Sequence, residues 1–494
     1  MYLVVLFASL LIFCAVVFAY AKSAYASVFH PFTYYCLFHG IVFVIRPLLS
    51  VWLNYEIIYR GFQFMPTEAE KITTIVVANL GFLSFGFFAF RHGAVPMVFK
   101  SDAFGAAEKR RLTSYFCWVA VFLAPFAFGS LLTSYTMAAN FEVASNMGRD
   151  AASGVMYNTN TNGYFVEAQL MLATLGAVLA WLFRFRLVAI APLVGFVLLR
   201  AGAGGRGPFV TALISTALFY LYEQRNRMPN FKTLALAAVL AVGFVQIGSD
   251  RGLSVRGWFG SDTSVLKARA PDLKFGEGMD FANLEFLEYL ITIIPERTHT
   301  YGYFNDVLQV FTEPVPRALW PGKPFGAPFE RISVFDYGNP SGMTRSMPGE
   351  GWYALGWAGV FIWCGLCGYA LGYIYRRFVQ SDQNAFQVAA YIMFLPILIV
   401  AYRDGQLVTV FRQGIFYLGP VLVWLVFAKL FKVRMGADMR RIAARKRANM
   451  AAGGNADKPA PDKWHGLPAA VRRRRLALAD QAGRPELPSP ISDA

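Results

Sequence analysis

The sequence predicts an all-α fold, a polytopic bundle of transmembrane helices. Of the 494 residues, 56% are hydrophobic and only 15% are charged, whereas soluble domains carry about 25% charged residues. The apolar residues also come in blocks of roughly 18–25, the length that crosses the hydrocarbon core of a bilayer. The alternating short strands typical of a membrane barrel are absent from the sequence.

Eleven hydrophobic blocks follow one another, and each predicts one membrane span. The first has no basic residue before it and no clear cleavage site, so we expect a retained helix rather than a signal peptide. The sixth and seventh are short and are joined by a glycine-rich turn. The predicted spans are 2–21, 31–53, 71–91, 113–137, 161–183, 187–201, 207–224, 232–249, 352–375, 385–402 and 410–431.

Lysine and arginine are concentrated in alternate short loops, and this bias sets the orientation. The basic set of loops predicts the cytoplasmic side, so the N-terminus lies outside and the C-terminus lies in the cytoplasm. The basic set comprises Lys22, Arg91, Lys100, Lys109, Arg110, Arg111, Arg184, Arg186, Arg225, Arg227, Lys232, Arg376 and Arg377. The opposite loops hold few, namely Arg60, Arg149, Arg206 and, before the last span, Arg403.

The chain therefore divides into four predicted parts. These are spans one to eight (1–249), a long extracytoplasmic loop (250–351), spans nine to eleven (352–435) and a tail (436–494). The tail is rich in Ala, Arg, Pro and Asp, which predicts disorder. The net charge of +16 is spread unevenly, and much of it lies in this tail, as is typical of a cytoplasmic segment beside anionic membrane lipids. Nucleic-acid binding is the alternative, and we expect no nucleic-acid partner.

The long loop carries most of the candidate chemistry. Residues 284–294 repeat Leu and Ile at helical spacing, which predicts a short amphipathic helix on the membrane surface or against the bundle. His299 follows Pro295 and is a candidate general base, with a solvated loop histidine as the alternative.

A proline- and glycine-rich stretch follows in the same loop. Arg317 and Lys323 bracket Trp320, which predicts a cation–aromatic platform for a sugar–phosphate junction. Arg345 and Glu350 stand at the mouth of the ninth span, where an ionisable residue is a functional candidate. Glu350 is expected to deprotonate an acceptor hydroxyl, to pair with Arg345, or both.

Further arginines are predicted on the same outer face. Arg200 and Arg206 flank a glycine-rich turn that lacks the strands of a dinucleotide fold. Glycines and arginines in this arrangement suit an anion, and a tight interhelical turn is the alternative. The other polar residues expected at this face are Arg251, Arg403, Asp404 and Arg412. Such clustered cations indicate a site for a pyrophosphate-bearing lipid, with structural ion pairs as the alternative.

The sequence gives no sign of a cofactor. All five cysteines lie in hydrophobic blocks, and Cys364-x-x-Cys367 inside a membrane helix is typical of packing residues rather than of a redox pair. We expect no disulfide, no metal and no cofactor. The chain contains no Asp-x-Asp triplet, which favours a metal-independent reaction.

Four features together carry a resemblance. They are the eleven-span layout with one long outer loop, the turn Gly205-Arg-Gly207, the run Pro316-Arg-Ala-Leu-Trp-Pro-Gly-Lys-Pro324, and Pro348-Gly-Glu350 leading into Gly356-Trp-Ala-Gly359. The pair Arg403-Asp404 fits as well. From Arg200 to the end of span eleven, the chain resembles the bacterial oligosaccharide repeat-unit polymerases, the Wzy family of O-antigen and exopolysaccharide polymerases.

The resemblance implies a GT-C-like membrane glycosyltransferase at the periplasmic face of the bacterial inner membrane. It would polymerise oligosaccharide repeat units carried on undecaprenyl pyrophosphate, with a chain-length regulator and a flippase as expected partners. Glu350, or else His299, would accept the proton of the acceptor hydroxyl. Trp320 and Arg345 would align the two substrates. The pyrophosphate leaving group would be stabilised by Arg200, Arg206, Arg403 and Arg412, assisted by Arg251.

Two alternatives stay open at this point. The related O-antigen ligases share the layout but move the glycan onto the lipid A core. A transporter or flippase of an anionic lipid-linked or small solute would also explain cations near the membrane. Transporters tend to show internal repeats and helices broken at the midplane, whereas this sequence has no convincing repeat and places its candidates at one face.

Overall fold

The computed structural model confirms the all-α class of a polytopic membrane protein. All the residues that it describes lie within one compact unit, Met1–Val433. They are residues 1–62, 64–100, 106–139, 147–149, 156–158, 165, 167–202, 206–231, 274, 276–278, 281–315, 319–320, 322–323, 328–329, 332–338 and 344–431.

Seven helical segments in the described part are long and apolar enough to cross a membrane. They are α1 (Tyr2–Lys22), the continuous run Pro31–Leu53, α5 (Glu68–Gly93), α6 (Ala106–Ala139), α17 (Met347–Gln380), α18 (Ala385–Asp404) and α19 (Leu407–Leu430). Helices also occupy the fifth to seventh predicted spans, as α9 (Met171–Leu182), α10 (Leu187–Gly202) and α11 (Arg206–Glu223). The eighth predicted span, 232–249, lies outside the described residues, so the count of eleven stays a prediction.

Short elements connect these helices. Gly148 of β1 (Met147–Arg149) pairs with Tyr157 of β2 (Met156–Asn158) in an antiparallel hairpin. The remaining short elements are α4 (Ile57–Phe62), η2 (Ala168–Leu170), α15 (Asn283–Ile293), η4 (Asn305–Leu308), α16 (Gln309–Thr312) and η5 (Val334–Asp336).

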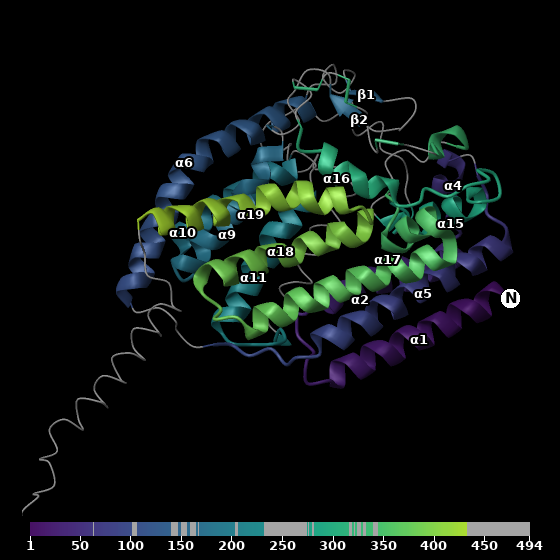
Figure 1. Ribbon diagram of the computed structural model, residues 1–494, viewed down its shortest axis with the longest axis horizontal. Helices are drawn as coiled ribbons and strands as arrows, with labels where there is room; N and C mark the ends of the chain where they lie inside the picture. Colours follow the sequence, from purple (N-terminus) through teal and green to yellow (C-terminus); the bar gives the residue numbers. More distant parts are fainter. Residues whose placement is uncertain are drawn as a thin grey trace, which may run out of the picture. The chain divides into compact units, whose positions relative to one another are not determined.

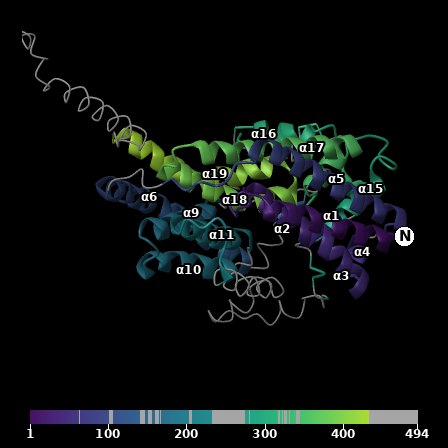
Figure 2. The same cartoon turned by 90° about the horizontal axis from the view of Figure 1, so that it is seen from below.

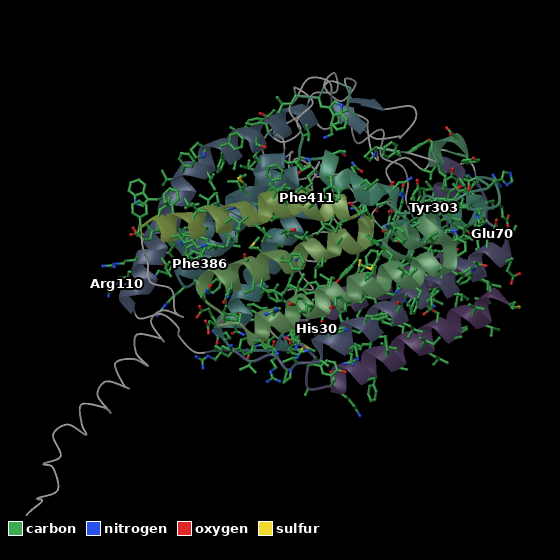
Figure 3. The ribbon with its side chains drawn as sticks, viewed as in Figure 1. His30, Glu70, Arg110, Tyr303, Phe386 and Phe411 are labelled. Atoms are coloured by element: carbon green, nitrogen blue, oxygen red, sulfur yellow. The ribbon has the colours of Figure 1, made fainter. Side chains whose placement is uncertain are left out.

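The long helices form a row of neighbours. α1 contacts α5, α5 contacts α17, α17 contacts α18, and α18 contacts α19, as Figure 1 shows. Turned by 90°, Figure 2 shows α6, α9, α10 and α11 gathered as a second group, and these helices also contact one another. Figure 3 places Arg110 at one end of the bundle and Glu70 and Tyr303 at the other. These are ends that the charge bias predicts to lie on opposite sides of the membrane.

Glycines allow α5 and α17 to pack closely. A Cβ atom at Gly368 would lie 2.3 Å from the Phe85 carbonyl oxygen, and one at Gly372 would lie 2.6 Å from that of Ala89. Small residues at such a contact let membrane helices pack backbone against backbone. The contact fixes the position of α17, whose first turn carries Glu350.

A π-helix places Arg46 inside the bundle. The segment η1 (Gly40–Ile45) is a π-helix between α2 (Pro31–His39) and α3 (Arg46–Leu53). A π-turn shifts the faces that the following residues present. Arg46 begins α3 directly after this shift, and its side chain is 3% exposed. The guanidinium therefore points into the protein from a predicted membrane span.

Helix α15 corresponds to the amphipathic helix expected at 284–294. Every residue from Asn283 to Ile293 is buried, including Glu285 and Glu288. Of the two expected placements, the structure therefore shows the helix against the bundle, and α15 contacts both α5 and α17. A membrane-surface helix would leave its polar face in water, and α15 has no exposed face.

Helix α17 is broken near its start. Leu355 and Gly356 have non-helical dihedral angles, with φ of +59° at Gly356. The backbone N–H groups of Gly302 and Tyr303 donate to the carbonyls of Tyr353 and Ala354 at 2.8 and 3.0 Å. The break thus separates a short first segment, which carries Glu350, from the long apolar remainder of the helix.

Candidate active site at the start of helix α17

The candidate site is built around Arg345, in the loop that leads into α17. Its Nη1 atom contacts Oδ2 of Asp306 and lies 3.1 Å from Oε2 of Glu350. The guanidinium also lies over the Tyr353 ring, 3.8 Å from its centroid. Gln406 Nε2 donates to the same Asp306 oxygen at 3.3 Å. Residues from η4, α17 and the turn between α18 and α19 therefore meet at one point.

The cluster is largely removed from water. The side chains of Arg345, Asp306 and Glu350 are 13%, 8% and 2% exposed. Burial disfavours the charged guanidinium, but the two carboxylates outweigh it and raise the pKa of Arg345 above its ordinary value. The arginine therefore remains a permanent cation, shared between two acids.

The segment beginning at Thr344 is held against the turn after α18. Ser346 N donates to the Arg403 carbonyl at 2.8 Å. From α15, the Asn283 amide nitrogen donates to the same carbonyl at 2.8 Å and to the Thr344 carbonyl at 2.7 Å. Asn283 thus joins two segments that lie far apart in the sequence, and it fixes Arg345 beside Arg403.

Gly405 is required by this close approach. It ends α18 with φ of +76°, a left-handed conformation that glycine adopts at low cost. A Cβ atom there would lie 2.1 Å from the Ser346 carbonyl oxygen and 3.0 Å from Cβ of Glu350. Glycine therefore brings the α18–α19 turn against the first turn of α17.

Four of the predicted site residues are close together. Arg345 pairs with Glu350, and Arg403 and Asp404 lie in the turn packed against them. Asp404 is in electrostatic range of Arg403 and Arg412 and of the hydroxyls of Thr344 and Thr409. The Arg403 Nε atom is buried and has no hydrogen-bond partner among the described residues. This leaves a donor at the site that a bound anion would satisfy.

Other predicted residues lie outside this cluster. Arg412 is 44% exposed and lies 3.9 Å from Glu167. Lys323 donates to the carbonyls of Glu313 and Val315 at 3.0 and 3.1 Å, which holds its own loop together. Trp320 is 40% exposed.

His299 is exposed in a turn with φ of +53°. No hydrogen bond or ion pair between described residues joins it to Arg345 or Glu350. Its role as a base stays a prediction.

The remaining predictions fall where no side chain is described. Arg200 lies in the last turn of α10 and Arg206 begins α11, so the backbone places both at the ends of consecutive helices. Arg251 and Arg317 lie outside the described residues.

A comparison with protein families matches residues 1–434 to the family described as O-antigen polysaccharide polymerase Wzy. The chain belongs to this family. The match includes the N-terminal spans, for which the motifs described above gave no resemblance. No curated protein and no solved structure matched the chain.

As a member of the Wzy family, the protein is an O-antigen polymerase of polysaccharide biosynthesis, embedded in a membrane by several helices. Family membership implies lipid-linked glycan substrates and polymerisation of the glycosyltransferase type. The buried cluster around Arg345 lies within the matched region.

Sequence reasoning missed three residues of this candidate site. Asp306 is 39 residues from Arg345, Asn283 is 120 residues from Arg403, and Gln406 is 100 residues from Asp306. Contacts over such separations leave no spacing pattern. The only local signal was an acidic residue in apolar surroundings, since Asp306 stands between Phe304 and Leu308.

Proposed function

We propose that this Wzy polymerase transfers a growing glycan from undecaprenyl pyrophosphate to the non-reducing end of a second lipid-linked repeat unit. The reaction takes place at the periplasmic face of the inner membrane. The observation that supports this most directly is the buried carboxylate of Glu350, held by Arg345. The Arg403 backbone is bonded to Ser346 at the start of the same helix, and the Arg403 Nε atom is buried without a partner among the described residues. A base and cations at one membrane face are what this transfer requires.

In the proposed reaction, the acceptor hydroxyl gives its proton to the Glu350 carboxylate. The acceptor oxygen then bonds to the anomeric carbon of the donor glycan. The bond between that carbon and the pyrophosphate oxygen breaks, and the electron pair leaves with the lipid pyrophosphate. A positioned carboxylate contributes to such a step because it removes the proton as the new bond forms.

Glu350 suits the role of base better than its neighbour Asp306. Among the described residues, Asp306 is held by both Arg345 and Gln406, whereas the Glu350 carboxylate accepts a hydrogen bond from Arg345 at 3.1 Å. Asp306 therefore acts as a positioning residue that keeps the guanidinium in place. His299 remains the second candidate base.

The leaving pyrophosphate needs positive charge that is already in place. We assign this role to Arg403 and Arg412, together with Arg200, Arg206 and Arg251. The loop residues Arg317, Trp320 and Lys323 are proposed to hold the sugar adjacent to the phosphate. With arginines neutralising the charge, the reaction is proposed to proceed without a metal ion. A flippase would supply the substrate, and a chain-length regulator would limit the product.

The test is reconstitution of the full chain in liposomes with lipid-linked repeat units, extracted from cells that lack this protein, in the presence of a chelator. We expect a ladder of repeat-unit multiples on a gel. The Arg403→Ala variant should lose it, and Arg110→Ala, an exposed arginine at the other end of the bundle, should keep it. Transfer only to lipid A core, or movement of the lipid without a ladder, would contradict the proposal.

A further inference from the structure

A polar cavity lies at the end of the bundle where α1 and α5 begin. Its volume is about 280 Å³, and its lining includes Tyr2, Asn54, Tyr55, Glu56, Tyr59 and Lys71. These residues come from α1, from the turn after α3, from α4 and from α5. Figure 1 shows the N-terminus, α4 and α15 at this same end of the molecule, and Figure 2 agrees. We call this cavity the N-terminal pocket.

A buried charged network lies behind the wall of the N-terminal pocket. The Tyr59 hydroxyl donates to Glu288 Oε2 at 2.7 Å. Arg46 Nε lies 2.8 Å from Glu285 Oε1, and the Arg46 guanidinium is 5.5 Å from the centre of the Tyr55 ring. Since Tyr55 and Tyr59 also line the pocket, the network reaches the pocket wall at two points.

The buried ionisable groups of this network are not needed to pack the helices together. Glu288 is 1% exposed, and its carboxyl group accepts a hydrogen bond from a neutral tyrosine, Tyr59, rather than from a cation. The Arg46 Nη2 atom is buried without a hydrogen-bond partner among the described residues. Buried ionisable groups and unsatisfied donors destabilise a fold, so their presence beside a cavity is a mark of function.

The lining indicates the class of ligand. The lining holds one cation, Lys71, and one carboxylate, Glu56, which is paired with Arg60, so it lacks the clustered cations that a pyrophosphate needs. Tyrosines offer ring faces and hydroxyls together. Flat apolar faces beside hydrogen-bonding groups suit a sugar ring, and the volume is at the lower end of ligand pockets, about one such ring.

Helix α15 links the N-terminal pocket to the candidate active site. Its Asn283 side chain holds the backbones of Thr344 and Arg403, while its Glu288 carboxylate receives the Tyr59 hydroxyl. The two residues are five positions apart, which is about 7.5 Å of helix rise. The same short helix therefore contacts both the pocket wall and the candidate active site.

We propose that the N-terminal pocket binds one sugar residue of the lipid-linked repeat unit, away from the bond that reacts. The proposal rests on the proposed polymerase function, because it takes the substrate from it. The pocket is a specificity-determining subsite, which holds the repeat unit while the reacting hydroxyl lies at Glu350.

The test compares two pocket variants of the full chain in detergent, with the lipid-linked repeat unit from cells lacking this protein as the probe. Lys71→Met removes the lining cation, and Ser50→Phe fills the pocket from the end of α3. Each should raise the KM for polymerisation and the Kd for the probe by about tenfold or more, with a smaller change in kcat. Lys22→Met is the matched control, because Lys22 also lies near an aromatic ring, 4.3 Å from the centre of Phe18.

Unchanged KM and Kd in both folded pocket variants would overturn the pocket proposal while leaving the polymerase intact. If the wild-type chain binds the probe but forms no polymer, the polymerase proposal fails. In that case loss of binding in Ser50→Phe would still support the pocket. A wild-type chain that fails to bind the probe overturns the pocket proposal.

Discussion

Arg345 donates to two carboxylates, and the three side chains carry one positive and two negative charges in a mostly buried place. Removing the cation would leave Asp306 and Glu350 facing each other without compensation. Removing one acid would leave a balanced pair. The two kinds of substitution are therefore expected to differ in their effect on folding.

We predict that Arg345→Met lowers the free energy of unfolding by about 3–5 kcal/mol, the usual effect of breaking a buried ion pair. Asp306→Asn should lower the free energy of unfolding by less, because Arg345 stays paired with Glu350. Arg377→Met is the matched control, since Arg377 is exposed and lies over the Tyr373 ring at 5.1 Å. Thermal unfolding in detergent measures all three. Equal melting temperatures for Arg345→Met and Arg377→Met would show that the cluster adds nothing to stability.

At the scale of elements, the site depends on how closely the α18–α19 turn approaches the start of α17. We predict that Gly405→Ala destabilises the protein by about 1–3 kcal/mol through backbone strain and abolishes polymer formation. The new Cβ atom would meet the Ser346 carbonyl at 2.1 Å. At Gly414, in α19, a Cβ atom would meet nothing within 4 Å, so Gly414→Ala should retain activity. An active Gly405→Ala protein would contradict the close approach.

Helix α15 carries a prediction about pH. Burial, and then the charge of Glu285, raise the pKa of Glu288 to about 8 from its ordinary value of 4.5; Tyr59, Lys71 and Arg46 lower it in part. The folded state thus holds this proton more tightly than the unfolded state. Its contribution to stability is complete below about pH 4.5 and is lost as the pH rises through about 8.

Replacing the acid should remove this dependence. We predict that Glu288→Gln flattens the fall in melting temperature between pH 5 and pH 8, because the amide does not titrate. Glu296→Gln, an exposed acid beyond the end of α15, should keep the wild-type slope. A Glu288→Gln protein with the wild-type slope would show that another group controls the dependence.

For the whole molecule, hydropathy was sufficient to place most of the helices. Apolar blocks of membrane length predicted the positions of α1, α5, α17, α18 and α19. Such a prediction is possible because each helix makes its backbone hydrogen bonds within one continuous segment. The pairing of Arg345 with Glu350 could also be predicted from the sequence, because the two residues are five positions apart at the start of a helix.

The rest depended on contacts between distant segments. Asn283 meets Arg403 and Arg46 meets Glu285 only after the chain has folded. The inward direction of Arg46 follows a π-helix, for which sequence periodicity gives no signal. The amphipathic pattern of α15 allowed a helix on the membrane surface or against the bundle. In the structure its glutamates are buried, with Glu285 bonded to Arg46 and Glu288 to Tyr59.

The two ends of the bundle are predicted to face opposite sides of the membrane. In a variant whose native cysteines are replaced by serine, Glu296→Cys should react with a membrane-impermeant maleimide added outside the inner membrane. Arg110→Cys should react only after the membrane is opened. Both positions are exposed. The reverse pattern of labelling would place the candidate site in the cytoplasm and contradict the proposed periplasmic reaction.

The central claim is that Glu350 accepts the proton of the acceptor hydroxyl. Its most direct test is single-turnover polymerisation by Glu350→Gln, together with binding of the lipid-linked repeat unit, with Glu296→Gln as the matched control. The account predicts a rate lowered by about 10²–10⁴-fold and a Kd close to that of the wild type, because the amide keeps the shape of the side chain and loses its basicity. A wild-type rate in a folded Glu350→Gln protein would contradict the claim and bring His299 forward as the base.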